Sequence, residues 1–310
     1  MIKQSIMNKN IFTLIVLLSG SSLAFSQSTE PADSLITVAG DTLWNVNGTF
    51  GLKFNQVTLT NWAKGGQNSL AGNATFDIEA KYAKDKIKWE NRLHLGYGQS
   101  KQGEGSFNKT DDQIVLNSSM GYELKGPWHL TISANFRTQF SQGFKLPNDS
   151  VVISTFMAPA YLVTGLALEY KSNNNFVFLT NPIANKTVFV LDDKLSAKGA
   201  YGVDTLAKVR SEFGAYISFS YKKEIIKNVT FTTNYAMFAD YKDLAVWDIN
   251  WDVIFNFKIN SYLAAKLSTN LIYDQDVKIP VDNTGDGIKE SFGARVQFRQ
   301  ALGIGFTVKF

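Results

Sequence analysis

The sequence has 310 residues, no cysteine, 13% aromatic residues and a formal net charge of +4. A mean hydropathy of −0.10 excludes a bundle of long apolar membrane helices. The lack of cysteine excludes structural disulfides, thiolate metal sites and a lipid-anchoring cysteine, and the weak charge does not indicate a nucleic-acid partner.

The N-terminal region has the pattern of a signal peptide over residues 1–26. Two lysines precede a short apolar run, and small residues at the end of this segment form a cleavage pattern. The apolar run is too short for a helix that crosses a bilayer, so a membrane anchor is the weaker interpretation. We expect residues 27–45 to form a polar periplasmic lead and residues 46–310 to form a β-barrel.

From residue 46 onward, apolar and polar residues alternate with the period of a β-strand. In the last segment, Phe306, Val308 and Phe310 alternate with glycine, threonine and lysine. The alternation predicts about twelve strands, an even number as in bacterial single-chain barrels. These strands are expected near residues 49–60, 70–82, 87–97, 114–124, 128–140, 162–170, 176–181, 213–221, 229–237, 247–257, 263–273 and 296–310. The predicted fold is therefore all-β, a transmembrane antiparallel up-and-down barrel, with a soluble β-fold as the alternative.

The connections between these strands alternate in length. Short links are expected at residues 84–86, 125–127, 172–175, 222–227 and 259–261, and longer ones at 100–111, 141–155, 182–206 and 275–289. Short periplasmic turns and longer outer loops are typical of outer-membrane barrels. We therefore predict a Gram-negative outer-membrane protein whose N-terminus is periplasmic. Aromatic residues near both strand ends suit two interfacial girdles: Trp89, Trp128, Tyr170, Tyr221, Tyr262 and Phe310 on the periplasmic side, and Tyr97, Phe140, Tyr241, Trp247 and Tyr273 on the outer side.

The polar face of the strands carries charges of both signs, which we expect to line the lumen. The lumen-lining candidates are Lys88, Glu90, Arg92, His94, Arg137, Asp248, Asp252, Lys266, Arg295 and Arg299, together with Asp77, Glu79, Lys81, Glu169, Lys258 and Asp274. Mixed charges neutralise one another, whereas a selective ion pore often concentrates one sign. A barrel of about twelve strands is wider than one filled by side chains and narrower than a porin. The lumen is therefore expected to be polar, salt-bridged and constricted.

Candidate catalytic and metal-binding residues are few. The two histidines, His94 and His129, fall on the inward face. Barrel phospholipases need a lipid-facing Ser-His pair, and barrel proteases need an acidic residue with a histidine at the outer rim, so neither histidine meets these positions. A mechanism based on lysine or tyrosine stays open. Residues 282–287 resemble the first half of a calcium loop, but Thr284 replaces a usual ligand and the final glutamate is missing. We predict no enzyme, no cofactor and no metal site, and an ordinary outer loop at residues 282–287.

The segment Asn61-Trp62-Ala63-Lys64-Gly65-Gly66 resembles the Asn-Trp-x-x-Gly-Gly signature of an uncharacterised Bacteroidota outer-membrane β-barrel family. Further matches lie at residues 158–161, 181–186, 273–274 and 303–310. Residues 181–183 read Asn-Pro-Ile, where the family more usually has Ser-Pro-Leu. The resemblance implies location and fold but no biochemical role. Asn61, Trp62, Gly65 and Gly66 then form either a motif in the barrel mouth or an ordinary glycine-rich hairpin.

Two classes of function fit these observations. The first is a narrow channel for small polar solutes, or a barrel whose outer loops bind a ligand. The second is a scaffold or accessory subunit of an envelope assembly or secretion complex, with a plugged lumen and an envelope protein as partner. A barrel hydrolase is a weaker third. In barrels that this chain resembles, a terminal aromatic residue is an insertion signal, so we expect Phe310 to be read by the barrel-assembly machinery before the strands contact outer-membrane lipids.

Overall fold

The computed structural model describes residues 43–59, 66–145, 150–172, 175–244, 247–281 and 291–310. Asn61, Trp62 and Gly65 of the expected mouth motif, the expected signal peptide and residues 282–287 therefore lie outside the described residues. Among the residues that are described, no helix is long and apolar enough to cross a membrane.

Twelve strands form one closed barrel in which each strand pairs with antiparallel neighbours in chain order. They are β1 (Trp44–Val57), β2 (Ser69–Lys84), β3 (Ile87–Gln102), β4 (Asn108–Glu123), β5 (Trp128–Thr138), β8 (Ala160–Ser172), β9 (Phe176–Phe189), β10 (Val209–Ile226), β11 (Val229–Asp240), β12 (Trp247–Lys258), β13 (Leu263–Tyr273) and β16 (Gln297–Lys309). The sequence prediction of an all-β antiparallel up-and-down barrel is confirmed.

The barrel closes where β16 pairs with β1. The register runs from Thr49 opposite Lys309 to Lys53 opposite Gly305. Beyond the strand, Gly48 and Phe310 exchange two backbone hydrogen bonds of 2.7 and 3.0 Å. The Phe310 ring stacks on Phe76 of β2 with 6.0 Å between the ring centroids. The seam thus pairs Thr49–Lys53 of β1 with Gly305–Lys309 of β16, and pairing of this stretch shortens the exposed strand edges.

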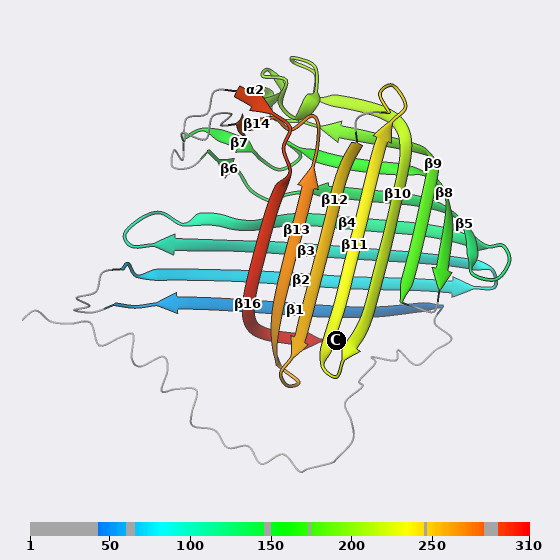
Figure 1. Cartoon of the computed structure of the whole chain (residues 1–310), viewed down its shortest axis with the longest axis horizontal. Helices are drawn as coiled ribbons and strands as arrows, with labels where there is room; N and C mark the ends of the chain where they lie inside the picture. The colour runs from blue at the N-terminus through cyan, green and yellow to red at the C-terminus, as the bar shows by residue number, and fades with distance from the viewer. Residues whose placement is uncertain (1–42, 60–65, 146–149, 173–174, 245–246, 282–290) are drawn as a thin grey trace, which may run out of the picture. The chain divides into compact units, whose positions relative to one another are not determined.

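All tight connections lie at the end of the barrel where β1 begins and β16 ends, which we call the turn end. They join β2 to β3, β4 to β5, β8 to β9, β10 to β11 and β12 to β13. The opposite end, which we call the loop end, carries the longer connections. In Figure 1, β6, β7 and β14 gather at the loop end, while the C-terminus lies at the other end.

Several expected boundaries were wrong, and each error has a local cause. β10 continues to Ile226, so the tight turn holds only residues 227–228 and not 222–227. β3 and β4 extend into the segment expected as the loop 100–111. β1 begins at Trp44, inside the expected polar lead. In each case charged or amide side chains continue the strand, since one face of a barrel strand tolerates polar residues.

The largest correction concerns β9, which continues through Pro182 to Phe189 although a loop was expected over residues 182–206. The pairing of β9 with both neighbours shifts register around residues 181–183. A bulge is one of the few places where a strand accepts proline. The extra residue reverses which positions point inward, so residues 177 and 179 before the bulge share a face with Ala184 and Lys186 after it.

The long connections carry additional short elements at the loop end. β6 (Gly143–Phe144) pairs with β7 (Val152–Ser154), and β14 (Ile279–Val281) pairs with β15 (Ser291–Gly293). The connection from β9 to β10 holds α2 (Asp193–Ser196) and the 3-10 turn η1 (Ala200–Gly202).

A small hydrophobic core lies at the loop end, where the β9–β10 connection packs against the start of β8 and the end of β9. Asp192 caps α2 by accepting hydrogen bonds of 2.9 Å from two backbone N–H groups of its first turn. The core is formed by Ala158, Val188, Val190, Leu195 and Val203, with Tyr161, Ala200 and Tyr201 packed against it. The connection therefore covers part of the loop end instead of extending away from it.

Candidate functional site

The outward face of the barrel is a continuous apolar surface. Ile132 on β5, Leu302 on β16 and Phe306 on β16 are 62%, 73% and 66% exposed. Similar large apolar side chains are exposed along the other barrel strands. Single exposed apolar residues are ordinary, but an apolar surface of this extent marks an interaction with lipid or protein. Most charged side chains of the strands lie on the opposite, inner face, while some neutral polar side chains such as Asn91 and Ser118 share the outer face with Trp89.

Contacts between strands that are not neighbours identify the inward face. Such side chains meet only through the interior, because a closed sheet separates the two faces. Asp111 of β4 pairs with Arg299 of β16 at 3.1 Å, and Glu90 of β3 pairs with Lys171 of β8 at 2.9 Å. When the Asn250 amide of β12 is turned so that its oxygen faces Arg137 of β5, this oxygen accepts two hydrogen bonds from the guanidinium, of 2.6 and 3.0 Å. Side chains thus cross the lumen at several places.

At the turn end, the inner wall of β2, β3 and β8 carries a dense network of ion pairs. Arg92 lies 2.6 Å from Glu79 and 3.6 Å from Glu90. Lys171 lies 2.9 Å from Glu90 and 3.3 Å from Glu169. Every charge in this group has an opposite charge beside it, so the wall contributes little net field.

A cavity of about 380 Å³ opens beside this network at the turn end, between β2, β3, β4 and β5. It is lined by Lys81, Tyr82, Ala83, Lys88, Glu90, Glu123, Gly126, Pro127, His129 and Lys171. Lys88 lies 3.1 Å from Glu123, so this cation is also paired. The structure thus brings Lys88, Glu90 and Arg92 of the expected lumen set together on one wall.

Both histidines are held by neighbouring polar groups. His94 Nδ1 lies 2.7 Å from Asp77 Oδ1 on β2. His129 is 2% exposed, its Nδ1 donates to the carbonyl of Pro127 at 3.2 Å, and its Nε2 lies 3.3 Å from the amine of Lys88. With the amine of Lys88 as donor, Nε2 is the acceptor, which describes a neutral ring inside a polar wall. Within the described residues, no group of three or more His, Cys, Asp or Glu is placed to hold a metal ion.

Nearer the loop end, Lys186 of β9 occupies a buried position among carboxylates and rings. Its side chain is 6% exposed, and the amine pairs with Glu212 at 3.2 Å and with Asp248 on β12. The amine also lies 6.0 Å from the Tyr161 ring centroid and 5.6 Å from that of Phe238. Burial with two carboxylates and two aromatic rings makes Lys186 the charged centre of this region, which we call the Lys186 hub.

Asp274, directly after β13, adds a further carboxylate to the Lys186 hub. Burial raises the pKa of the Asp274 carboxyl to about 6, while the attraction of Lys186 opposes this rise and the like charge of Asp248 adds to it. Next to the hub, Arg210 pairs with Asp276 at 2.7 Å and donates to the carbonyl of Gly202 at 3.0 Å. The hub is therefore tied to the connection that covers this side of the loop end.

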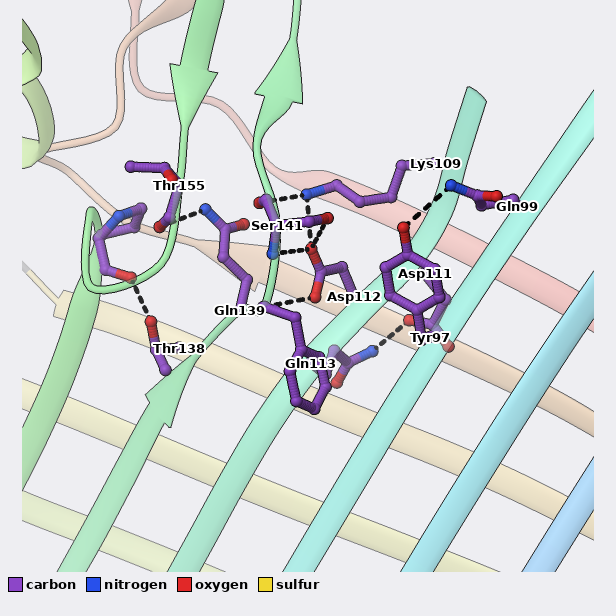
Figure 2. A network of polar contacts seen from close by, with 12 residues as sticks. Tyr97, Gln99, Lys109, Asp111, Asp112, Gln113, Thr138, Gln139, Ser141 and Thr155 are labelled. Atoms are coloured by element: carbon purple, nitrogen blue, oxygen red, sulfur yellow. Dashed lines mark hydrogen bonds and ion pairs between the residues drawn. The ribbon is translucent and has the colours of Figure 1, made fainter. Parts of the chain in front are cut away.

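A second polar network, drawn in Figure 2, fastens the segment after β5 to the start of β4. Asp112 accepts hydrogen bonds from Lys109 at 2.7 Å, from the backbone N–H groups of Phe140 and Ser141 at 2.7 and 3.0 Å, and from the Ser141 hydroxyl at 2.9 Å. Lys109 also donates to the Ser141 carbonyl at 3.0 Å. These bonds hold the start of the β5–β8 connection, which carries β6 and β7, at the barrel rim.

The remaining expected site residues lie at other places on the inner wall or outside it. Lys266 of β13 and Asp252 of β12 occupy inward positions opposite Asn256 and Asn270, while Asp248 belongs to the Lys186 hub. Arg295 precedes β16, is exposed and donates to the carbonyl of Ala294 at 2.9 Å, so the structure places it outside the barrel wall. Gly66 follows β1 with a φ of +115°, a conformation that favours glycine.

Sequence reasoning missed several inward charges that the structure places in the lumen. These are Lys53, Asp111, Lys171, Lys186 and Glu212. Lys53 lies inside the first expected strand and Asp111 at the end of the loop expected at residues 100–111, and strict alternation from Thr49 and Gln113 directs both side chains inward. Lys186 lay in the expected loop, and the bulge in β9 hid its direction.

Comparison with known proteins gives one family match. Residues 54–144 match the model of a family described as a protein of unknown function (DUF3078). This agrees with the expectation of an uncharacterised family, whereas the Bacteroidota source and the Asn-Trp-x-x-Gly-Gly signature stay predictions. No curated protein matches the chain.

Among solved structures, the chain is similar to barrels of several kinds. An outer membrane channel from Pseudomonas putida F1 has 10% identity and a TM-score of 0.40, with 91% of this chain and 100% of that chain covered. The NanC porin has 8% identity and a TM-score of 0.35, covering 84% and 98%. Outer membrane phospholipase A from Escherichia coli has 9% identity and a TM-score of 0.33, covering 85% and 95%.

Proposed function

We propose that this chain is an outer-membrane β-barrel that passes small polar solutes through a water-filled lumen. The apolar outer surface supports the membrane location, because a closed sheet satisfies its own backbone hydrogen bonds and can face lipid on alternate residues. Short turns at one end support a periplasmic turn end, and in this proposal the N-terminus of β1 is periplasmic as well.

The exposure of inward charges is the observation that carries the channel. The side chains of Asp77, Arg92 and Arg299 point into the barrel, and yet they are 49%, 48% and 45% exposed. In a barrel filled by its own side chains, inward charges would be buried. Solvent-accessible space therefore lies next to these groups, although the Lys186 hub and the contact between Arg137 and Asn250 narrow the lumen. A lumen narrowed in this way suits small polar solutes and not folded proteins.

Conductance in a planar lipid bilayer tests the channel. The full chain, refolded in detergent and checked by the change in gel migration on heating, is expected to give discrete current steps. Because the chain has no cysteine, single cysteines can be introduced without background labelling. A charged thiol reagent is expected to reduce the current of Ser268→Cys, whose hydroxyl faces inward, and to leave that of Thr269→Cys, the next residue on the outward face, unchanged.

Two results would overturn this function. Folded barrels that give no current support the scaffold or accessory subunit with a plugged lumen. Equal block of both cysteine variants would mean that the current does not pass through the barrel interior.

A further inference from the structure

Beside the closing seam of the barrel, three basic side chains converge over one strand. Lys53 of β1, Lys266 of β13 and Arg299 of β16 all occupy inward positions, and β16 lies between the other two strands. Their charges are close enough to interact, since both Lys266 and Arg299 repel the Lys53 amine while Asp111 attracts it. We call this group the seam cluster.

The backbone of β16 lets the Lys53 side chain lie across the seam. A Cβ added to Gly305 would lie 2.7 Å from Lys53 Cγ, and a Cβ added to Gly303 would lie 2.9 Å from Lys53 Cδ. Gly303 is also the register partner of Lys266. The Lys53 amine would lie 3.8 Å from the Cβ added to Gly303, and Lys266 occupies the position opposite the same glycine on the other neighbouring strand. The two glycines thus leave room for the Lys53 side chain to lie along β16, where a larger side chain would displace it.

The acidic residue nearest the seam cluster is already engaged. Asp111 is 11% exposed at its side chain and bonds to Arg299 at 3.1 Å, Gln113 at 2.8 Å and Asn73 at 3.0 Å. Within the described residues, neither Lys53 nor Lys266 has a carboxylate in ion-pair distance. The seam cluster therefore keeps an excess of positive charge, in contrast to the paired charges at the turn end.

We propose that the seam cluster is a binding site for the anionic group of the permeating solute, a carboxylate or phosphate, which makes the lumen anion-selective. This inference rests on the proposed channel. The ammonium groups of Lys53 and Lys266 supply strong donors. The guanidinium of Arg299 contacts Asp111 through one terminal nitrogen and offers its other N–H groups in the planar arrangement that suits an oxyanion. A solute anion here replaces the carboxylate that the wall lacks.

Ion selectivity in the planar bilayer tests the proposal on the full chain. Under a KCl gradient, the reversal potential of the unmodified channel is expected to show a preference for chloride. The double variant Lys53→Gln/Lys266→Gln is expected to lose it, with the chloride-to-potassium permeability ratio falling by about threefold for each charge removed. The matched control, Lys125→Gln/Lys227→Gln, removes the same charge from two exposed turns and is expected to keep the ratio of the unmodified chain.

Inorganic phosphate serves as the probe of binding in the same bilayers. We expect millimolar phosphate to reduce the chloride current of the unmodified chain and of the turn control, but not that of the seam variant. A carboxylate series of increasing size, measured in the same way, separates recognition of a carboxylate from that of a phosphate.

The outcomes distinguish this inference from the function on which it rests. A folded barrel without current overturns the channel and the site together. A conducting barrel that prefers potassium, or whose permeability ratio is the same with and without Lys53 and Lys266, leaves the channel standing and overturns the site. Phosphate that inhibits the unmodified chain and the seam variant equally also overturns it.

Discussion

Two lysines on the inner wall, Lys186 and Lys53, stand in opposite surroundings. Lys186 is almost fully buried, with Glu212 and Asp248 in contact with its amine. Lys53 is half-buried, and two of its three charged neighbours are cations. A buried charge persists only where opposite charges and hydrogen bonds compensate for lost hydration. The Lys186 hub is therefore part of what holds the loop end together, whereas Lys53 has no carboxylate at ion-pair distance within the described residues and is available for the proposed anion site.

The other charged side chains of the lumen fall into the same two groups, paired and unpaired. Charges that face each other across the interior, such as Glu90 and Lys171, neutralise the wall and restrict the lumen. Charges of one sign that gather without partners set up a field in the lumen, which favours one sign of solute. The composition of the inner wall shows only that charges of both signs are mixed. Whether a charge has an ion-pair partner distinguishes structural charges from candidate functional charges.

The largest expected effect comes from removing the cation of the hub. Lys186→Met leaves the Asp248 carboxylate without its ion-pair partner and Glu212 with Arg210 alone, so we expect the free energy of unfolding to fall by about 3–5 kcal/mol. Urea unfolding of the refolded barrel, followed by tryptophan fluorescence, measures the change. Lys222→Met, at an exposed inward position of β10 near the turn end, is the control and is expected to stay within about 0.5 kcal/mol of the unmodified chain. Equal losses in both variants would contradict the distinction between the two settings.

A smaller effect depends on pH and concerns Asp274 at the edge of the hub. Its folded pKa of about 6 lies above the ordinary value of 3.8, so folding favours the protonated form. The resulting stabilisation is complete below pH 3.8 and is lost as the pH rises through 6. Asp274→Asn keeps a neutral group at every pH. The variant is therefore expected to match the unmodified chain near pH 4 and to exceed it by up to about 3 kcal/mol near pH 7. Unfolding curves that differ by the same amount at both pH values would contradict this.

The strands were predictable from the sequence because their signals are local. Alternation along twelve segments and turn-forming residues between them are properties of neighbouring residues, and both agree with the barrel. The bulge at Pro182 was not predictable in this way, since it interrupts the alternation, and it turned a strand into an apparent loop. The short pairs β6–β7 and β14–β15 were also missed, because strands of two or three residues leave almost no periodic pattern.

The candidate site was predictable only in part. Alternation shows that Arg299 and Lys266 face inward, and both were expected in the lumen. That Arg299 meets Asp111 from the other side of three intervening strands depends on how the sheet curves and closes, which no local pattern contains. The same holds for Lys186 and Asp248. Inward direction is thus a sequence property, whereas pairing across the lumen is a property of the closed barrel.

The smallest expected change in stability concerns the seam cluster and gives the sharpest form of the comparison. Because Lys53 and Lys266 repel each other and have no carboxylate partner within the described residues, Lys53→Gln/Lys266→Gln is expected to change the free energy of unfolding by less than about 0.5 kcal/mol, or to raise it slightly. The measurement is the same urea unfolding, at low salt, where repulsion between cations is least screened. A loss approaching that of Lys186→Met would mean that the seam lysines hold the barrel closed, and that their charge is not free for a solute.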